Sequence, residues 1–158
     1  MKRVVLASAA VVALALSSNS AFAKDLPQGG LTVQEVAKWL QDSGYKAEIQ
    51  TSRDGSQNVY SASDGTGFHV YMYDCHNGPR CASIQFSVGF DTKGAWNAAK
   101  MNAWNSDNRW VRAYVDDTND PWVEMDVDLA PGGSWENLND EFAVWRDMLA
   151  RFTKYINW

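Results

Sequence analysis

The clearest pattern of hydrophobic and polar positions lies between residues 111 and 129, where two alternating runs flank a turn. In each run every second residue is apolar, which is typical of a strand with one buried face. The residues between the runs, Asp-Thr-Asn-Asp-Pro at 117–121, are turn formers. The pattern predicts an antiparallel hairpin. Its apolar face comprises Val111, Ala113, Val115, Val123, Met125, Val127 and Leu129.

The other face of this hairpin is polar and aromatic. The turn sets Arg112 opposite Glu124 or Asp126, depending on its exact length, and such an opposed pair of charges is worth about 0.2–1 kcal/mol. Exposed aromatic rings beside charges are typical of a contact surface; the alternative is that a helix covers the face and buries the rings. The candidate binding face comprises Trp110, Arg112, Tyr114, Trp122, Glu124 and Asp126.

A helical pattern ends the chain. Ser134 follows the helix-breaking residues 131–133 and is a favourable N-cap. From there, large apolar residues recur at alternating spacings of three and four, the period of one helix face. We predict one long helix laid across the sheet; the alternative is a seam with a second subunit, a homodimer through this helix. The stripe comprises Trp135, Leu138, Phe142, Trp145, Leu149, Phe152 and Ile156.

The first part of the chain predicts a helix followed by four strands. Thr32 and Glu35 form a capping box, and the helix that they begin runs to about residue 43, before Gly44. The predicted strands cover residues 45–51, 57–63, 68–75 and 81–88. An alanine-rich stretch at 92–106 predicts a second helix. The fold class is therefore α+β, an antiparallel sheet of about six strands flanked by helices, in the order α-β-β-β-β-α-β-β-α.

Cys75 and Cys81 indicate the register of the third and fourth strands. If they face each other, antiparallel pairing sets His69 against Ser87 on a polar face and apolar residues against apolar residues on the other. A shift of one residue would mix the two faces. The pattern therefore supports a structural disulfide between Cys75 and Cys81, which contributes roughly 2 kcal/mol in the chain-entropy model.

Residues 1–23 have the order of a cleaved secretory signal, with a basic start, an apolar run and an Ala-Phe-Ala ending. The apolar run, residues 4–16, is shorter than the ~20 residues that span a bilayer, so we expect no membrane span. Cleavage near Ala23 would place the protein in the periplasm or outside the cell. The expected organisation is the signal at 1–23, a short arm at 24–30 and a single α+β domain at 31–158.

The mature chain is expected to be acidic. The full sequence has 14 Lys and Arg against 19 Asp and Glu. Cleavage after Ala23 removes Lys2 and Arg3, which leaves 12 basic against 19 acidic residues, a net charge of −7. Such a chain repels a phosphate backbone, so we expect no nucleic-acid partner.

The residues offer little catalytic chemistry. Glycoside hydrolysis uses two carboxyl groups across a cleft. The candidates here, Asp116, Glu124 and Asp126, follow a pattern more typical of a solvated strand surface. His69 and His76 suit neither a catalytic triad nor a metal site. We expect no enzyme, no cofactor and no metal, and we retain as an alternative a glycan or peptidoglycan binder that uses exposed Trp beside acids.

Short motifs follow one another in a fixed order along residues 30–157. They are Cys75 with Cys81, Ile-Gln-Phe at 84–86, Phe90, Trp-Asn at 104–105, Arg109, Arg-Ala-Tyr-Val-Asp at 112–116 and Glu-Met-Asp-Val-Asp-Leu at 124–129. In this order and spacing the chain resembles the YbjN-like family of bacterial proteins.

The resemblance implies a fold like that of the type III secretion chaperones, a curved antiparallel sheet flanked by helices, and a role as a sensory transduction regulator. It carries over no catalytic residue. The export signal and the cysteine pair depart from a cytoplasmic regulator. We therefore expect an exported, non-catalytic binding or regulatory module that acts on an envelope protein through direct protein–protein contact.

Overall fold

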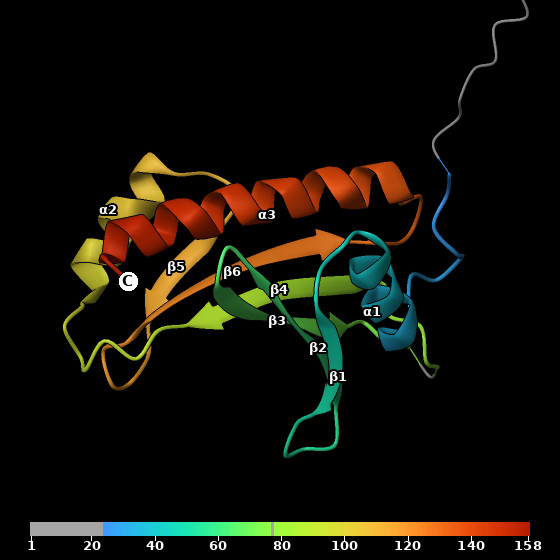
Figure 1. The fold of residues 1–158 in the computed structure, drawn as a ribbon, viewed down its shortest axis with the longest axis horizontal. Coiled ribbons are helices and arrows are strands. Elements are labelled where there is room, and N and C mark those ends of the chain that lie inside the picture. Colours follow the sequence, from blue (N-terminus) through green and yellow to red (C-terminus); the bar gives the residue numbers. More distant parts are fainter. Residues whose placement is uncertain (1–23, 77) are drawn as a thin grey trace, which may run out of the picture.

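The computed structural model describes residues 24–76 and 78–158, and the expected signal peptide lies outside them. Within these residues, three helices and six strands follow one another in the predicted order, which confirms the α+β class (Figure 1). No helix in this part of the chain has the length and apolar character needed to cross a membrane. The elements are α1 (Val33–Asp42), β1 (Ala47–Thr51), β2 (Gln57–Ser63), β3 (Thr66–Tyr73), β4 (Ser83–Gly89), α2 (Ala98–Asp107), β5 (Arg112–Val115), β6 (Pro121–Asp128) and α3 (Trp135–Ile156).

The strands form one antiparallel sheet in the order β1-β2-β3-β4-β6-β5. The chain leaves β4, passes through α2 and returns as the β5–β6 hairpin, with β6 beside β4 and β5 at the edge. The register predicted from the cysteines is confirmed, since His69 pairs with Ser87. Arg112 pairs with Glu124, which decides between its two predicted partners.

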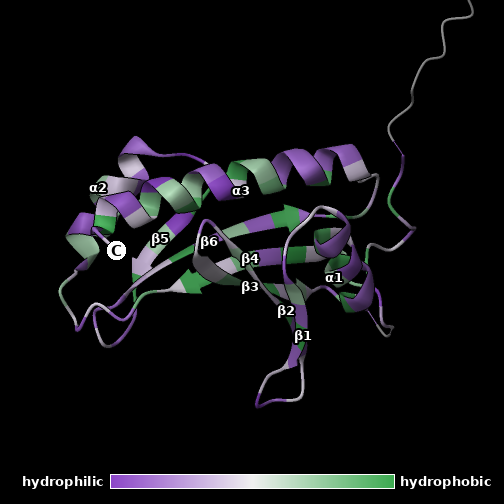
Figure 2. Ribbon diagram, in the orientation of Figure 1, coloured by the Kyte–Doolittle hydropathy of each residue, from purple (hydrophilic) through white to green (hydrophobic). Residues whose placement is uncertain are grey.

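The helices pack against one face of the sheet, where their buried residues join the inward strand residues in a single hydrophobic cluster. The ring of Phe86 in β4 stacks on Phe142 of α3, with centroids 5.6 Å apart, and on Trp145 at 5.5 Å. Hydrophobic and hydrophilic residues alternate along α3, which runs along the sheet (Figure 2). The stripe predicted on the last helix is thus packed in the chain's own core rather than exposed to a second subunit.

α2 begins later than the composition predicts, at Ala98 rather than Thr92. The carboxylate of Asp120, in the turn between β5 and β6, accepts hydrogen bonds from the backbone N–H groups of Thr92 (2.7 Å) and Gly94 (3.2 Å). These bonds hold the preceding segment as a loop. The side chain of Asn97 then caps the helix. A contact between distant parts of the chain here overrides local helix propensity.

The predicted disulfide joins Cys75 and Cys81 at the end of the β3–β4 pair. Cys81 is buried, and its backbone pairs with that of Leu31 just before α1. The neighbouring Arg80 donates hydrogen bonds to both carboxylate oxygens of Glu35 in α1, at 2.7 and 2.8 Å. The bonded loop therefore also holds the start of α1 against the sheet.

Replacing both cysteines with serine is expected to lower the free energy of unfolding by roughly 2 kcal/mol, because the bond closes a short loop in the unfolded chain. Urea unfolding followed by tryptophan fluorescence measures this change. The intact mass of the untreated protein should rise on reduction by the hydrogens that one disulfide lacks. Two free thiols in the untreated protein would contradict the assignment.

Candidate binding face

The sheet face opposite the helices carries polar and aromatic side chains. Side chains alternate between the faces of a strand, so the strand registers bring these residues together. No helix in residues 24–76 and 78–158 packs on this face, so the alternative of a covering helix does not hold. We call it the open face. Its members are Asn58, Tyr60, His69, Tyr71, Tyr73, Gln85, Ser87, Arg112, Tyr114, Trp122, Glu124, Asp126 and Asp128.

A buried carboxylate organises the β4–β6–β5 part of the open face. Glu124 is only 7% exposed. Its carboxylate accepts hydrogen bonds from the hydroxyl groups of Tyr114 (2.9 Å) and Ser87 (3.2 Å), and it forms an ion pair with Arg112. Such partners offset the cost of burying a charge. The Arg112 side chain is 66% exposed, so the group presents a fixed guanidinium to solvent.

Two aromatic rings lie beside this group. Tyr114 and Trp122 stack with centroids 6.3 Å apart and 14° between their planes. The indole lies over Gly89, where any Cβ would overlap the ring. Its Nε1–H donates a hydrogen bond to Asp116 Oδ2 at 3.1 Å. Strand pairing, hydrogen bonds and a glycine therefore hold the two half-buried rings as a flat platform.

The Tyr114 phenol and the Asp116 carboxyl each keep one protonation state near neutral pH. Burial, and then the hydrogen bond to Glu124, raise the pKa of Tyr114 from 10.0 to about 12. Hydrogen bonds, first that of the Thr118 hydroxyl, lower the pKa of Asp116 from 3.8 to about 2. The phenol therefore remains a hydrogen-bond donor, and the Asp116 carboxylate remains charged.

The β2–β3 part of the open face holds a second aromatic group, which was not among the residues predicted from the sequence. His69 stacks on Tyr71 with centroids 5.7 Å apart, and its centroid lies 5.3 Å from that of Tyr60. Its Nδ1 is hydrogen-bonded to Asn58 Oδ1 at 2.9 Å. Burial lowers the pKa of His69, which favours the neutral ring. The cysteine register, which sets these side chains on the polar face, is the signal that could have found them.

The structure brings the predicted candidate residues together, with one exception. Arg112 and Tyr114 lie in the row already described, and Asp126 accepts a hydrogen bond from Gln85 at 2.8 Å. Trp110 lies apart, because it precedes β5 and has a φ of 78°. This positive φ turns the chain and ends the alternation that predicted its position. Trp110 is 57% exposed and lies beside the outer edge of β6.

The three acids considered for hydrolysis, Asp116, Glu124 and Asp126, form hydrogen bonds or ion pairs with neighbouring side chains. A general acid needs a raised pKa, whereas that of Asp116 is lowered by hydrogen bonds from its own turn. Glu124 is held by Arg112 and by two hydroxyl groups. Asp126 is exposed and bonded to a neighbouring amide. This arrangement suits a binding surface better than acid–base catalysis.

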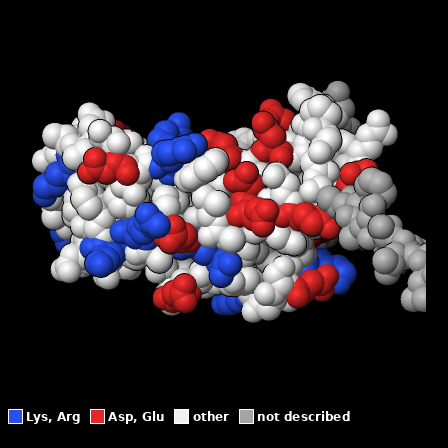
Figure 3. Space-filling view, turned by 90° about the horizontal axis from the view of Figure 1, so that it is seen from above, with Lys and Arg blue, Asp and Glu red and all other residues white. Residues whose placement is uncertain are grey.

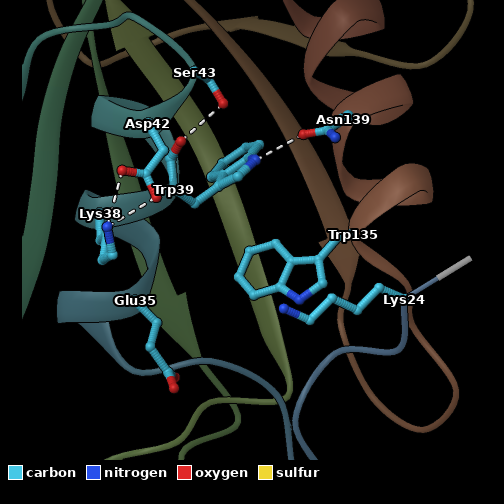
Figure 4. Close-up of a pocket in the computed structure, with 8 residues that line it drawn as sticks. All are labelled: Lys24, Glu35, Lys38, Trp39, Asp42, Ser43, Trp135 and Asn139. Atoms are coloured by element: carbon cyan, nitrogen blue, oxygen red, sulfur yellow. Dashed lines mark hydrogen bonds and ion pairs between the residues drawn. The ribbon is translucent and has the colours of Figure 1, made fainter.

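A separate hollow of about 390 Å³ lies between α1 and α3 (Figure 4). Its walls include Trp39, Trp135 and Lys24. The Nε1–H of Trp39 donates a hydrogen bond to Asn139 Oδ1 at 2.8 Å. Trp39 is only 6% exposed, so the half-buried Trp135 is the indole in this hollow with surface for a ligand. The open face has two stacked, half-buried rings beside a fixed ion pair, so it is the stronger candidate.

The domain matches a known protein family. Residues 32–158, from the N-cap of α1 to the last residue, match the family model YbjN, described as "putative bacterial sensory transduction regulator". The chain belongs to the YbjN family. A search of curated proteins gives no match. The YbjN match includes every helix and strand described above, and the family description supports a regulatory module rather than an enzyme.

Proposed function

We propose that this YbjN-family protein is an exported, non-catalytic regulatory module that binds an envelope protein through the open face. The observation that carries the proposal is the uncovered platform of Tyr114 and Trp122, held beside the Arg112–Glu124 pair. Tryptophan, tyrosine and arginine are the residues that dominate binding energy at protein interfaces.

The platform is preorganised for contact. Tyr114 is fixed by its hydrogen bond to Glu124, and Trp122 by its hydrogen bond to Asp116. Ordering a free side chain at an interface costs about 0.5–1.5 kcal/mol. Side chains that are already ordered avoid most of this cost. The open face can therefore bind a partner without rearranging its central residues.

The charges around the platform indicate the character of the partner. Arg112 is matched by Glu124, whereas Asp126 and Asp128 are exposed with no paired cation among the described residues. Interface charges set orientation and association rate more than affinity. We expect a partner that presents basic groups around an apolar or aromatic contact.

Two features support export. The first is the Cys75–Cys81 disulfide, since structural disulfides persist in oxidising compartments. The second is the sequence of residues 1–23, which has the order of a secretory signal. Both features favour a partner in the cell envelope.

The proposal is tested by affinity capture from an envelope extract with the parent protein and with Trp122→Ala. Loss of the indole removes half of the platform, so the variant should recover at least about tenfold less partner, as expected for an interface hot spot. Trp158→Ala is the matched control, because Trp158 is also an exposed tryptophan (63%) but packs beside Phe90 at the end of α3. The control should capture as much partner as the parent.

Two outcomes would contradict the proposal. In the first, Trp122→Ala and the parent recover the same proteins in the same amounts. In the second, the parent binds isolated peptidoglycan or soluble glycans, and Trp122→Ala abolishes that binding, which would favour the glycan-binding alternative.

A further inference from the structure

The outer edge of β6 is longer than the strand that pairs with it. β6 has eight residues and β5 has four. The β5–β6 pairing ends at Arg112 and Glu124. Beyond that point, residues 125–128 of β6 have β4 on one side, and no strand from residues 24–76 or 78–158 on the other. The sheet therefore has a step at this edge.

The contacts of Ala113 show which backbone groups point out at the step. Its N–H and C=O bond to the side chain of Asn105 in α2, both at 2.9 Å, and therefore point away from β6. Backbone groups alternate in direction along an antiparallel strand, so the neighbouring pair Arg112–Glu124 is the one hydrogen-bonded across β5 and β6. By the same alternation, the N–H and C=O groups of Asp126 and Asp128 point outward. No hydrogen bond to these outward groups is found within residues 24–76 and 78–158.

A hollow of about 290 Å³ lies along the step. On the strand side it is lined by residues 125–128, and on the other sides by Trp110, Asn137 and Glu141. Trp110 precedes β5 and has a positive φ, and its ring lies beside the hollow with 57% of the residue exposed. The hollow thus combines unpaired strand backbone with an aromatic wall.

The surroundings of the hollow are mainly acidic. Asp126, Asp128 and Glu141 line it. Two basic side chains lie nearby: Arg109, which lies over the Trp110 ring, and Arg112, which is paired with Glu124. Seen from the α3 side, Asp and Glu gather on the half of the molecule where α3 begins (Figure 3). A cationic segment would be attracted to this edge.

We propose that β6 residues 125–128 bind an extended, basic segment of a partner protein as an added β-strand that continues the line of β5. The added backbone would bond to the outward groups of Asp126 and Asp128. Its side chains would alternate between the faces of the sheet. Basic side chains on one face would meet the two aspartates, and apolar side chains on the other would meet Met125, Val127 and Trp110.

The same residues disfavour a second copy of the chain as the occupant. Two β6 edges paired antiparallel would bring aspartates close to aspartates, and like charges across strands are destabilising. At the β5 edge, the outward groups of Ala113 already bond to Asn105, both at 2.9 Å. The β1 edge differs in charge, because its Glu48 is paired with Lys46. The step in β6, whose two aspartates have no paired cation among the described residues, is therefore the edge that best suits a cationic strand.

The test uses a short synthetic peptide that alternates lysine and valine, titrated into the protein and followed by NMR. Amide shifts should change at residues 125–128 and at Trp110, and the Asp126 and Asp128 amides should become protected from hydrogen exchange. A peptide with glutamate in place of lysine should bind at least about tenfold more weakly. Asp128→Pro removes one outward N–H and should also weaken binding about tenfold, whereas Asp128→Asn, which keeps the N–H, should weaken it less.

A second measurement uses only the unmodified protein, so its result does not depend on whether Asp128→Pro folds. The lysine–valine peptide methylated on alternate backbone nitrogens cannot pair fully with the edge, so it should bind the unmodified protein at least about tenfold more weakly. Equal binding of the methylated or glutamate peptides would overturn the proposal. So would a concentration-dependent dimer that Asp128→Pro dissolves, because a second copy would then occupy the edge.

The edge site rests on the proposed function in one respect, that the partner is a polypeptide. Trp122→Ala should leave binding of the lysine–valine peptide unchanged, because Trp122 lies on the open face and does not line the hollow. Failure of the peptide to bind would therefore overturn the edge site alone. Failure of Trp122→Ala to reduce capture of the envelope partner would overturn the open-face contact alone.

Discussion

Replacing Phe142 with alanine is expected to lower the free energy of unfolding by about 3 to 5 kcal/mol, as for other large-to-small changes in cores. Phe142 is 4% exposed and lies between the helices and the sheet. Its ring contacts Trp39 of α1 at 5.3 Å and Phe86 of β4 at 5.6 Å, measured between centroids. Its removal leaves a cavity where three elements meet. Leu149 is also buried on α3, so Leu149→Ala should cost a similar amount.

Urea unfolding of the purified variants measures this effect. Asp147→Ala is the control on the same helix, because Asp147 is exposed and makes only a surface ion pair with Arg151, and such pairs contribute at most about 1 kcal/mol. If Phe142→Ala and Leu149→Ala keep the parent stability but change the sedimentation coefficient, the stripe is a subunit seam and the packing described above is wrong.

Replacing Glu124 with alanine is expected to cost about 2 to 3 kcal/mol, although the residue lies on a face that no helix covers. The loss arises from its partners. Ser87 is 1% exposed, so its hydroxyl cannot turn to solvent, and the Tyr114 hydroxyl loses its acceptor. The exposed Arg112 guanidinium returns to water and contributes little.

Chemical unfolding measures the stability change, and alkaline titration of tyrosine absorbance provides a second readout. Without Glu124, the pKa of Tyr114 should fall from about 12 towards its ordinary value of 10.0. Because the folded pKa is raised, the phenol contributes to stability below pH 10 and loses this contribution as pH rises through 12. Asp128→Ala is the control and should cost less than about 1 kcal/mol, because Asp128 is exposed and its side chain makes no hydrogen bond or ion pair within residues 24–76 and 78–158. Equal effects of the two substitutions would contradict the role of Glu124.

The period-two and helical patterns predicted most of the fold because each element buries a single face. The pairing of Cys75 with Cys81 fixed one register, and the alternation around the 117–121 turn placed Arg112 near Glu124. Patterns of this kind depend on near neighbours along the chain. They therefore predict elements and faces well.

The features that escaped prediction depend on contacts between distant residues or on a single dihedral angle. The start of α2 is set by Asp120, which lies beyond the helix in sequence. The position of Trp110 follows from its positive φ, which no alternation signals. The burial of Glu124 depends on Ser87 in β4 and Tyr114 in β5, which donate hydrogen bonds to its carboxylate from the two neighbouring strands. The alternating pattern of β6 alone does not indicate these partners.

The most direct test of the open face as the contact surface is site-specific photo-crosslinking in intact cells. A photoreactive phenylalanine analogue is placed at Tyr73, which is 47% exposed on the open face, or at Arg151, which is exposed on α3. If the open face binds the partner, the Tyr73 position gives a discrete crosslinked protein, and Trp122→Ala removes that product. A product from the Arg151 position with none from Tyr73 would place the partner on the helical face and contradict the account.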